Sequence, residues 1–173
     1  YAAYRGWPRT EADYYDRLAR GYATLCRFES EADLNPEQIF VDCANGVGAA
    51  KLARLVDAAR SAGAPIALSL RTASSDAPGS LNKDVGADYV QKEQNVPKHG
   101  GFSELPPGSK CVSIDGDADR LVYFYADAET KRTRLLDGDK IAALVATRVG
   151  ELLGACGDPL RSELTVGVVQ TAY

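Results

Sequence analysis

One stretch of the chain constrains its fold more than any other. A short apolar run, Cys111–Ile114, ends abruptly in aspartates at every second position, Asp115, Asp117 and Asp119. The apolar run predicts a buried β-strand. The aspartates then fall in the turn beyond the carboxyl end of that strand, which is where open α/β sheets place their ligands. The sequence therefore predicts an α/β fold with a ligand site at this edge of the sheet.

The spacing of the three aspartates predicts a divalent metal site. Three converging carboxylates without a cation would repel one another. Residues two apart in a straight strand are separated by about 6.6 Å, whereas Mg²⁺ holds oxygen ligands at about 2.1 Å. Asp115, Asp117 and Asp119 can therefore share one Mg²⁺ only if the backbone curls, which Gly116 permits. The next residue, Arg120, adds a positive charge suited to phosphate oxygens.

Other interpretations of the acidic stretch differ in how well they fit. A solvated acidic turn is the simplest alternative. An EF-hand does not fit, because its sixth and twelfth positions would be Arg120 and Ala126 instead of Gly and Glu. A haloacid-dehalogenase-like phosphatase wants Thr or Val where Asp119 stands. Another Asp-x-Asp enzyme, such as a phosphatase or a nucleotide-sugar glycosyltransferase, remains open, and so does a non-catalytic metal-binding module.

Composition limits the partners. The net charge of −4 argues against non-specific nucleic-acid binding, which needs basic patches. No apolar run approaches the roughly 20 residues that span a bilayer, and the start does not read as a signal peptide. The four cysteines form no Cys-x-x-Cys pair, so we expect free thiols and a reducing, cytoplasmic location.

The periodicity of the chain predicts a three-layer α/β/α sandwich with a mixed, mostly parallel sheet. The connection from 115 to 121 is too short for a parallel crossover, so one strand should run antiparallel. In the helix after the N-cap residue Thr10, we expect a packing stripe of Tyr14, Leu18, Tyr22 and Leu25. In the helix capped by Asp137, we expect four residues to point inward: Ile141, Leu144, Val145 and Leu152. The expected elements are helices at 11–28, after 48, at 86–93 and at 137–153, with strands at 39–43, 66–70, 111–115, 121–126, 133–136 and 164–171.

Three further features are interpreted as structural. The turn Gly46–Gly48 lacks the third glycine of a dinucleotide fingerprint and the P-loop pattern, so a structural tight turn is favoured over a phosphate cradle. His99 lies in a Gly/Pro-rich stretch, 97–101, which predicts a surface loop. Asp137-Gly-Asp139 repeats the acidic spacing, but its position at a helix start favours N-capping.

Five motifs together carry a resemblance to a known family. The acidic loop, Asp115–Arg120, resembles the metal-binding loop of the α-D-phosphohexomutases. With four other motifs it is similar to the phosphoacetylglucosamine mutases, from about Thr10 to the end; these are Val41–Gly46, Gly86–Val90, Leu136–Ile141 and Gly167–Tyr173. The segment Thr72–Ser75 looks like half of the family's phosphoserine loop, but the His-Asn that should follow is missing and its position is wrong. We therefore expect the nucleophilic serine to lie outside this chain.

The resemblance implies a function for the whole enzyme. It implies interconversion of N-acetylglucosamine 6-phosphate and N-acetylglucosamine 1-phosphate through a phosphoserine in another domain, for UDP-N-acetylglucosamine synthesis. In this chain it implies Mg²⁺ on Asp115, Asp117 and Asp119, with Arg120 as a catalytic residue that steadies the phosphate in transit. It further implies that 1–9 is a linker from a preceding domain, that 10–163 is the metal-binding domain, and that 164–173 begins the following domain.

Overall fold

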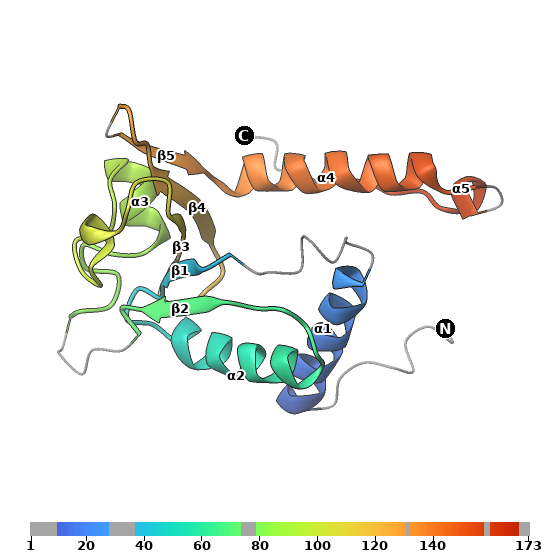
Figure 1. Ribbon diagram of the computed structural model, residues 1–173, viewed down its shortest axis with the longest axis horizontal. Helices are drawn as coiled ribbons and strands as arrows, with labels where there is room; N and C mark the ends of the chain where they lie inside the picture. The colour runs from blue at the N-terminus through green and yellow to red at the C-terminus, as the bar shows by residue number, and fades with distance from the viewer. Residues whose placement is uncertain (1–9, 28–36, 74–78, 131, 158–159, 170–173) are drawn as a thin grey trace. The chain divides into compact units, whose positions relative to one another are not determined.

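The structure is a computed structural model that describes residues 10–27, 37–73, 79–130, 132–157 and 160–169. It contains a five-stranded mixed sheet (Figure 1). The strand order is β2-β1-β3-β4-β5. Strands β1 and β2 are parallel, as are β1 and β3, whereas β4 runs antiparallel to β3. The predicted mixed sheet and its antiparallel strand are therefore confirmed. The strands are β1 Ile39–Asp42, β2 Leu68–Arg71, β3 Lys110–Ile114, β4 Leu121–Ala126 and β5 Thr133–Leu136.

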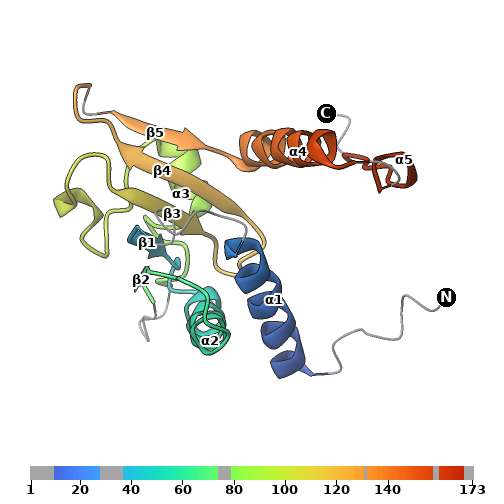
Figure 2. The ribbon, with the colours of Figure 1, turned by 45° about the vertical axis from the view of Figure 1, so that its right-hand side comes forward.

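Helices cover both faces of this sheet (Figure 2). Helix α2, Gly48–Ser61, lies on one face and α3, Ala87–Glu93, on the other. Side chains of β3 point alternately to the two faces of the sheet, because successive side chains of a strand point in opposite directions. Ile114 packs in the cluster that includes Ala49 of α2, whereas Cys111 packs with Val90 of α3. The predicted α/β sandwich with two helical layers is therefore confirmed.

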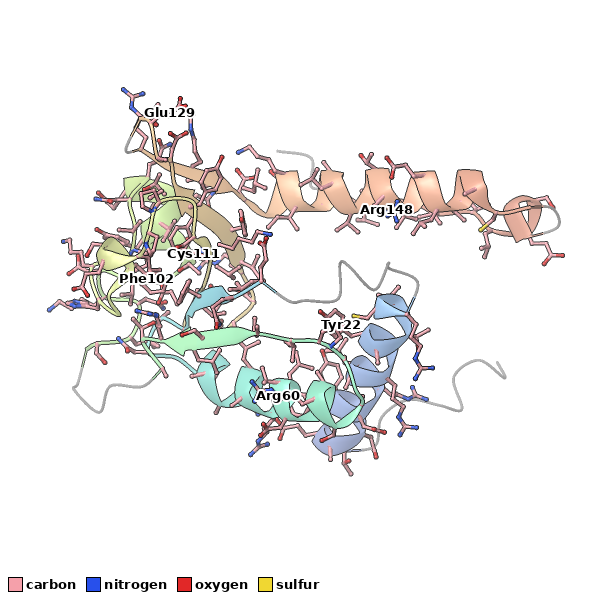
Figure 3. The ribbon with its side chains drawn as sticks, in the orientation of Figure 1. Tyr22, Arg60, Phe102, Cys111, Glu129 and Arg148 are labelled. Carbon is pink, nitrogen blue, oxygen red and sulfur yellow. The ribbon has the colours of Figure 1, made fainter. Side chains whose placement is uncertain are left out.

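The core on the α3 side contains the largest buried side chains. Phe124 of β4 is fully buried, and its ring lies 5.9 Å from that of Phe102. Phe102, labelled with Cys111 in Figure 3, belongs to the short 3₁₀ helix Phe102–Glu104. Pro97, which we expected in a surface loop, is also buried, because the adjacent Val96 packs against this core. His99 is exposed, as predicted.

Helix α1, Glu11–Cys26, begins at Thr10 as predicted, with a capping box in which Thr10 and Asp13 each accept the other's backbone N–H. The predicted packing stripe is wrong. Tyr14, Leu18, Tyr22 and Leu25 are exposed, and the buried residues of α1 are Ala19 and Ala23. These alanines pack on Ala59 of α2. Small side chains at a helix crossing let the two backbones approach closely, which leaves the larger neighbours at the edge of the contact.

Residues 136–173 form a second compact unit, separate from 1–135. Helix α4, Gly138–Ala155, is capped by Asp137, which accepts from the Lys140 N–H at 3.1 Å. This N-cap was predicted, but the inward face was not predicted correctly. None of the α4 residues is buried, since the described residues of this unit provide no layer to cover it. Of the four residues that we expected to point inward, Leu144, Val145 and Leu152 are exposed.

The predicted final strand is also wrong over the residues that the structure describes. After the short helix α5, Leu160–Glu163, the described residues 164–169 form no strand. A strand needs a neighbour for its backbone hydrogen bonds, and the five strands of the sheet do not include this segment. The rest of that predicted strand, 170–171, lies outside the described residues, as do the predicted linker 1–9 and Ser74 and Ser75. The domain boundaries stay predictions.

Strand β2 begins at Leu68, two residues later than predicted, because its register pairs Leu68 with Ile39 at the start of β1. Within the described ranges, no helix combines the length and the apolar composition that crossing a membrane requires.

Candidate metal centre

The backbone after β3 curls into a compact loop. Ala118 adopts a left-handed conformation, with φ of 64°, and its N–H donates to the Asp115 carbonyl oxygen at 3.1 Å. The N–H groups of Asp119 and Arg120 both donate to Oδ1 of Asp115, at 3.1 and 3.2 Å. The loop thus wraps around the carboxylate of its own first residue, and the curling that a shared ion would need is present.

The three aspartates of this acidic loop, Asp115–Arg120, come close together. One carboxylate oxygen from each of Asp115, Asp117 and Asp119 lies within 4.8 Å of the other two. Oxygens that are about 2.1 Å from a single Mg²⁺ lie at most about 4.2 Å apart. Asp117 and Asp119 are exposed, so their side chains can rotate to close this small difference. The all-oxygen donor set fits a hard cation such as Mg²⁺.

Asp115 is the fixed member of the set. It is only 2% exposed, and its Oδ2 accepts from Nε of Arg120 at 2.7 Å. Burial raises the pKa of the Asp115 carboxyl, but the backbone and side-chain hydrogen bonds from Arg120 outweigh burial and hold that pKa below its usual value. Asp115 is therefore charged at neutral pH.

Asp119 differs from Asp115 in its electrostatic environment. The charge of Asp117 raises the pKa of the exposed Asp119 carboxyl above its usual value, and the hydrogen bond with Asp115 adds to this effect. Arg120 Nε lies 3.6 Å from Asp119 Oδ1, which offsets part of the repulsion. A like-charge cluster of this kind gains from a bound cation.

The acidic loop rests on backbone of the β1–α2 turn. The Val47 N–H donates to the Gly116 carbonyl oxygen at 3.0 Å. A side chain at Gly46 would place its Cβ 2.2 Å from that oxygen, and one at Gly116 would meet Leu81 Cδ1 at 2.6 Å. The predicted structural role of the Gly46 turn is confirmed, and the turn supports the acidic loop directly.

Sequence analysis missed a buried carboxylate that accepts hydrogen bonds from several segments at this edge of the sheet. Asp42, at the end of β1, is fully buried. Its Oδ2 accepts from the Gly86 N–H at 2.7 Å and from Ser113 Oγ at 2.5 Å, and its Oδ1 accepts from the Ala44 N–H at 3.0 Å and from the Thr72 hydroxyl. The signal was an aspartate that ends an apolar strand, as Asp115 does.

Arg120 and Asp88 form a second feature that was missed. Arg120 Nη1 donates to Oδ1 of Asp88, in the first turn of α3. Lys92 also contacts Asp88, at 3.1 Å. The predicted catalytic residue Arg120 lies beside the predicted metal ligands, since it contacts Asp115. Asp139 belongs to the second unit. His99 makes no described contact with the three aspartates.

A cavity of about 560 Å³ adjoins the acidic loop. Asp119 and Arg120 line it on the loop side, with Tyr14 and Leu18 from α1 and Lys51 from α2. Two of the exposed apolar residues of α1, Tyr14 and Leu18, therefore border a space that opens beside the candidate metal centre.

The mixed sheet, its two helical layers and an Asp-x-Asp-x-Asp-Arg loop at the end of a buried strand define a domain of the α-D-phosphohexomutase class. A family model described as Phosphoacetylglucosamine mutase AMG1, domain II, matches residues 7–122. The chain therefore belongs to the phosphoacetylglucosamine mutase family.

Named relatives and solved structures support the same family. Phosphoacetylglucosamine mutase of Arabidopsis thaliana is 40% identical over 98% of this chain and 30% of its own length. The Aspergillus fumigatus N-acetylphosphoglucosamine mutase, solved with GlcNAc-6P and magnesium, has 37% identity and a TM-score of 0.81, over 98% of this chain and 32% of that one. An apo N-acetylglucosamine-phosphate mutase of the α-D-phosphohexomutase superfamily has 35% identity and a TM-score of 0.77, over 96% and 33%. This chain thus spans about 30% of the first relative's length.

Proposed function

We propose that this chain is the metal-binding domain of a longer phosphotransferase that interconverts N-acetylglucosamine 6-phosphate and N-acetylglucosamine 1-phosphate. One observation carries the proposal: the acidic loop, which gathers three carboxylates, lies inside the segment matched by the family model, 7–122. The magnesium and GlcNAc-6P of the related A. fumigatus structure support the same metal and the same substrate class.

Each charged residue of the acidic loop has a role in this proposal. Asp115, Asp117 and Asp119 would hold Mg²⁺, and Asp115 is already fixed by three hydrogen bonds. When bound, the ion would supply Lewis-acid stabilisation of a phosphate oxygen. The side chain of Arg120 is 56% exposed, so it can steady the charge of a phosphoryl group in transit, where positioning and electrostatics account for most of the catalysis.

Other parts of the longer enzyme complete the proposed reaction. The phosphoserine, which would exchange phosphate with a bisphosphorylated sugar, belongs to a neighbouring domain, and so do the sugar-binding loops. The activity would feed UDP-N-acetylglucosamine synthesis. We place the enzyme in the cytoplasm, where a reducing environment suits the free thiols of its buried cysteines.

An assay of the full-length protein tests this proposal. We expect it to interconvert the two sugar phosphates, to lose activity with a chelator and to regain it with added Mg²⁺. Release of inorganic phosphate without interconversion would favour the phosphatase alternative. Neither activity, or interconversion that the chelator leaves unchanged, would contradict the proposed role of the domain.

A further inference from the structure

Arg120 is held from two sides by carboxylates of different elements. Its Nε donates to Asp115 in its own loop at 2.7 Å, and its Nη1 donates to Asp88 in α3. An arginine side chain has several rotatable bonds, and a contact at Nε alone leaves the far end of the guanidinium free to turn. The second anchor at Nη1 fixes the plane of the group, because guanidinium donors have a rigid geometry.

The position of Asp88 is itself set by the core. Gly86, which precedes α3, donates its N–H to the buried Asp42 at 2.7 Å. A Cβ at Gly86 would lie 3.2 Å from Ala44 Cβ and 3.6 Å from the Ile114 carbonyl oxygen, so the start of α3 is packed against the ends of β1 and β3. Asp88 therefore stands at a fixed place relative to the loop that follows β3.

We propose that Asp88 is a positioning residue that orients the guanidinium of Arg120 toward the phosphoryl group. Among the described residues, Nε and Nη1 of Arg120 have hydrogen-bond partners, and Nη2 has none. Of the five guanidinium N–H donors, the two carboxylates thus leave both of Nη2 and the second one of Nη1 for an incoming anionic oxygen, in a fixed direction. A catalytic group displaced by about 1 Å can cost up to about 100-fold in rate. This inference rests on the proposed phosphoryl transfer.

Variants of the full-length enzyme test the role of Asp88. Asp88→Ala should lower kcat about 10- to 100-fold and change KM less than about threefold, since the contact acts on a group used in the transition state. Lys92→Ala is the matched control. It removes the other ion pair of Asp88 and leaves the pair with Arg120, so it should keep kcat near the wild-type value. Equal losses in the two variants would overturn the proposal.

A double-mutant cycle separates positioning from a general structural effect. If Asp88 acts through Arg120, then Asp88→Ala should lower kcat no further in an Arg120→Ala background. If the kcat losses of the two single variants multiply in the double variant, Asp88 acts independently of Arg120, and the proposal is overturned.

A readout on the 173-residue chain keeps the proposal testable without mutase activity. Rotation of the Arg120 guanidinium, followed by ¹⁵N NMR and assigned with Arg120→Lys, should be slow in the wild type and faster in Asp88→Ala. Unchanged rotation would overturn the proposal. If the wild-type enzyme proves inactive, the proposed function fails, and the NMR result alone decides whether Asp88 anchors Arg120.

Discussion

At the scale of single residues, two of the four cysteines are buried in or beside the sheet. Cys43 follows β1 and Cys111 lies in β3, and both are buried on opposite faces of the sheet. Burial raises the pKa of each thiol to about 11. The thiolate is the reactive form, so these two cysteines should be inert in the folded protein.

Thiol titration checks this expectation. Cys26 and Cys156 are partly exposed and should react with a thiol reagent at pH 8 in the native chain. Cys43 and Cys111 should react only after denaturation, which brings the total to four. Fast reaction of all four in the native state would contradict the described burial. Fewer than four after denaturation, in protein kept from air, would reveal a disulfide and contradict the cytoplasmic expectation.

Asp127, in the turn between β4 and β5, should contribute stability that depends on pH. The N–H groups of Thr130 and Glu129 donate to its carboxylate, each at 2.9 Å. These hydrogen bonds lower the pKa of Asp127 from 3.8 to about 2. The stabilisation is therefore present above about pH 3.8 and is lost as pH falls from there through about 2.

Thermal melts test the role of Asp127. Asp127→Asn should lower Tm at pH 7, and its difference from the wild type should shrink as pH falls through about 2. Glu129→Gln is a control, because no described residue donates a hydrogen bond to the Glu129 carboxylate. An Asp127→Asn difference that stays the same from pH 7 to pH 2, or a control that matches it, would contradict this account.

At the scale of elements, the acidic loop depends on a backbone contact with the β1–α2 turn. A Cβ at Gly46 would lie 2.2 Å from the Gly116 carbonyl oxygen, whereas one at Gly21 in α1 would meet nothing within 4 Å. Gly46→Ala should therefore cost about 1–3 kcal/mol as an overpacking change. Gly21→Ala should stabilise by about 0.5–1 kcal/mol through helix propensity.

Denaturant unfolding of the two glycine variants measures the contrast. Opposite signs for Gly46→Ala and Gly21→Ala would support direct packing of the turn under the acidic loop. If Gly46→Ala leaves the free energy of unfolding unchanged, the β1–α2 turn and the acidic loop can move apart without cost, which would contradict direct packing.

The sequence predicted those elements that depend on neighbouring residues or on short connections between strands. The apolar run before Asp115, the caps at Thr10 and Asp137, and the antiparallel β4 follow from periodicity, capping chemistry and connection length. The buried faces of α1 and α4 were not predictable, because hydrophobic spacing does not say which neighbour covers a helix. The Asp88–Arg120 pair was missed for a similar reason, since it joins residues 32 positions apart.

At the scale of the whole molecule, the chain carries only part of the proposed active site. It covers 30% of the length of the A. thaliana relative, and we expect the phosphoserine to lie outside it. We therefore expect the purified 173-residue chain to have no mutase activity, and to leave N-acetylglucosamine 6-phosphate unchanged even with Mg²⁺ and a bisphosphorylated sugar. Turnover by the pure chain would show that its own residues supply the nucleophile.

The central claim is that the exposed carboxylates of the acidic loop hold a metal for catalysis. Asp117→Ala in the full-length enzyme removes one of them from a turn where packing contributes little. Loss of a contact to the transition-state charge typically costs about 3–4 kcal/mol, or 10²–10³ in kcat, while loss of a surface-turn charge costs about 0.5 kcal/mol in stability. The matched control is Asp139→Ala, which removes an exposed carboxylate from the same Asp-Gly-Asp spacing at the start of α4.

The most direct test is kcat measured against Mg²⁺ concentration for these two variants, with thermal melts in the presence and absence of the ion. We predict that Asp117→Ala loses activity at limiting Mg²⁺, recovers part of it at high Mg²⁺ and melts close to the wild type without metal, while Asp139→Ala follows the wild type throughout. Wild-type turnover of Asp117→Ala at limiting Mg²⁺, or a fall in its melting temperature both with and without metal, would contradict the assignment of this loop as the metal centre.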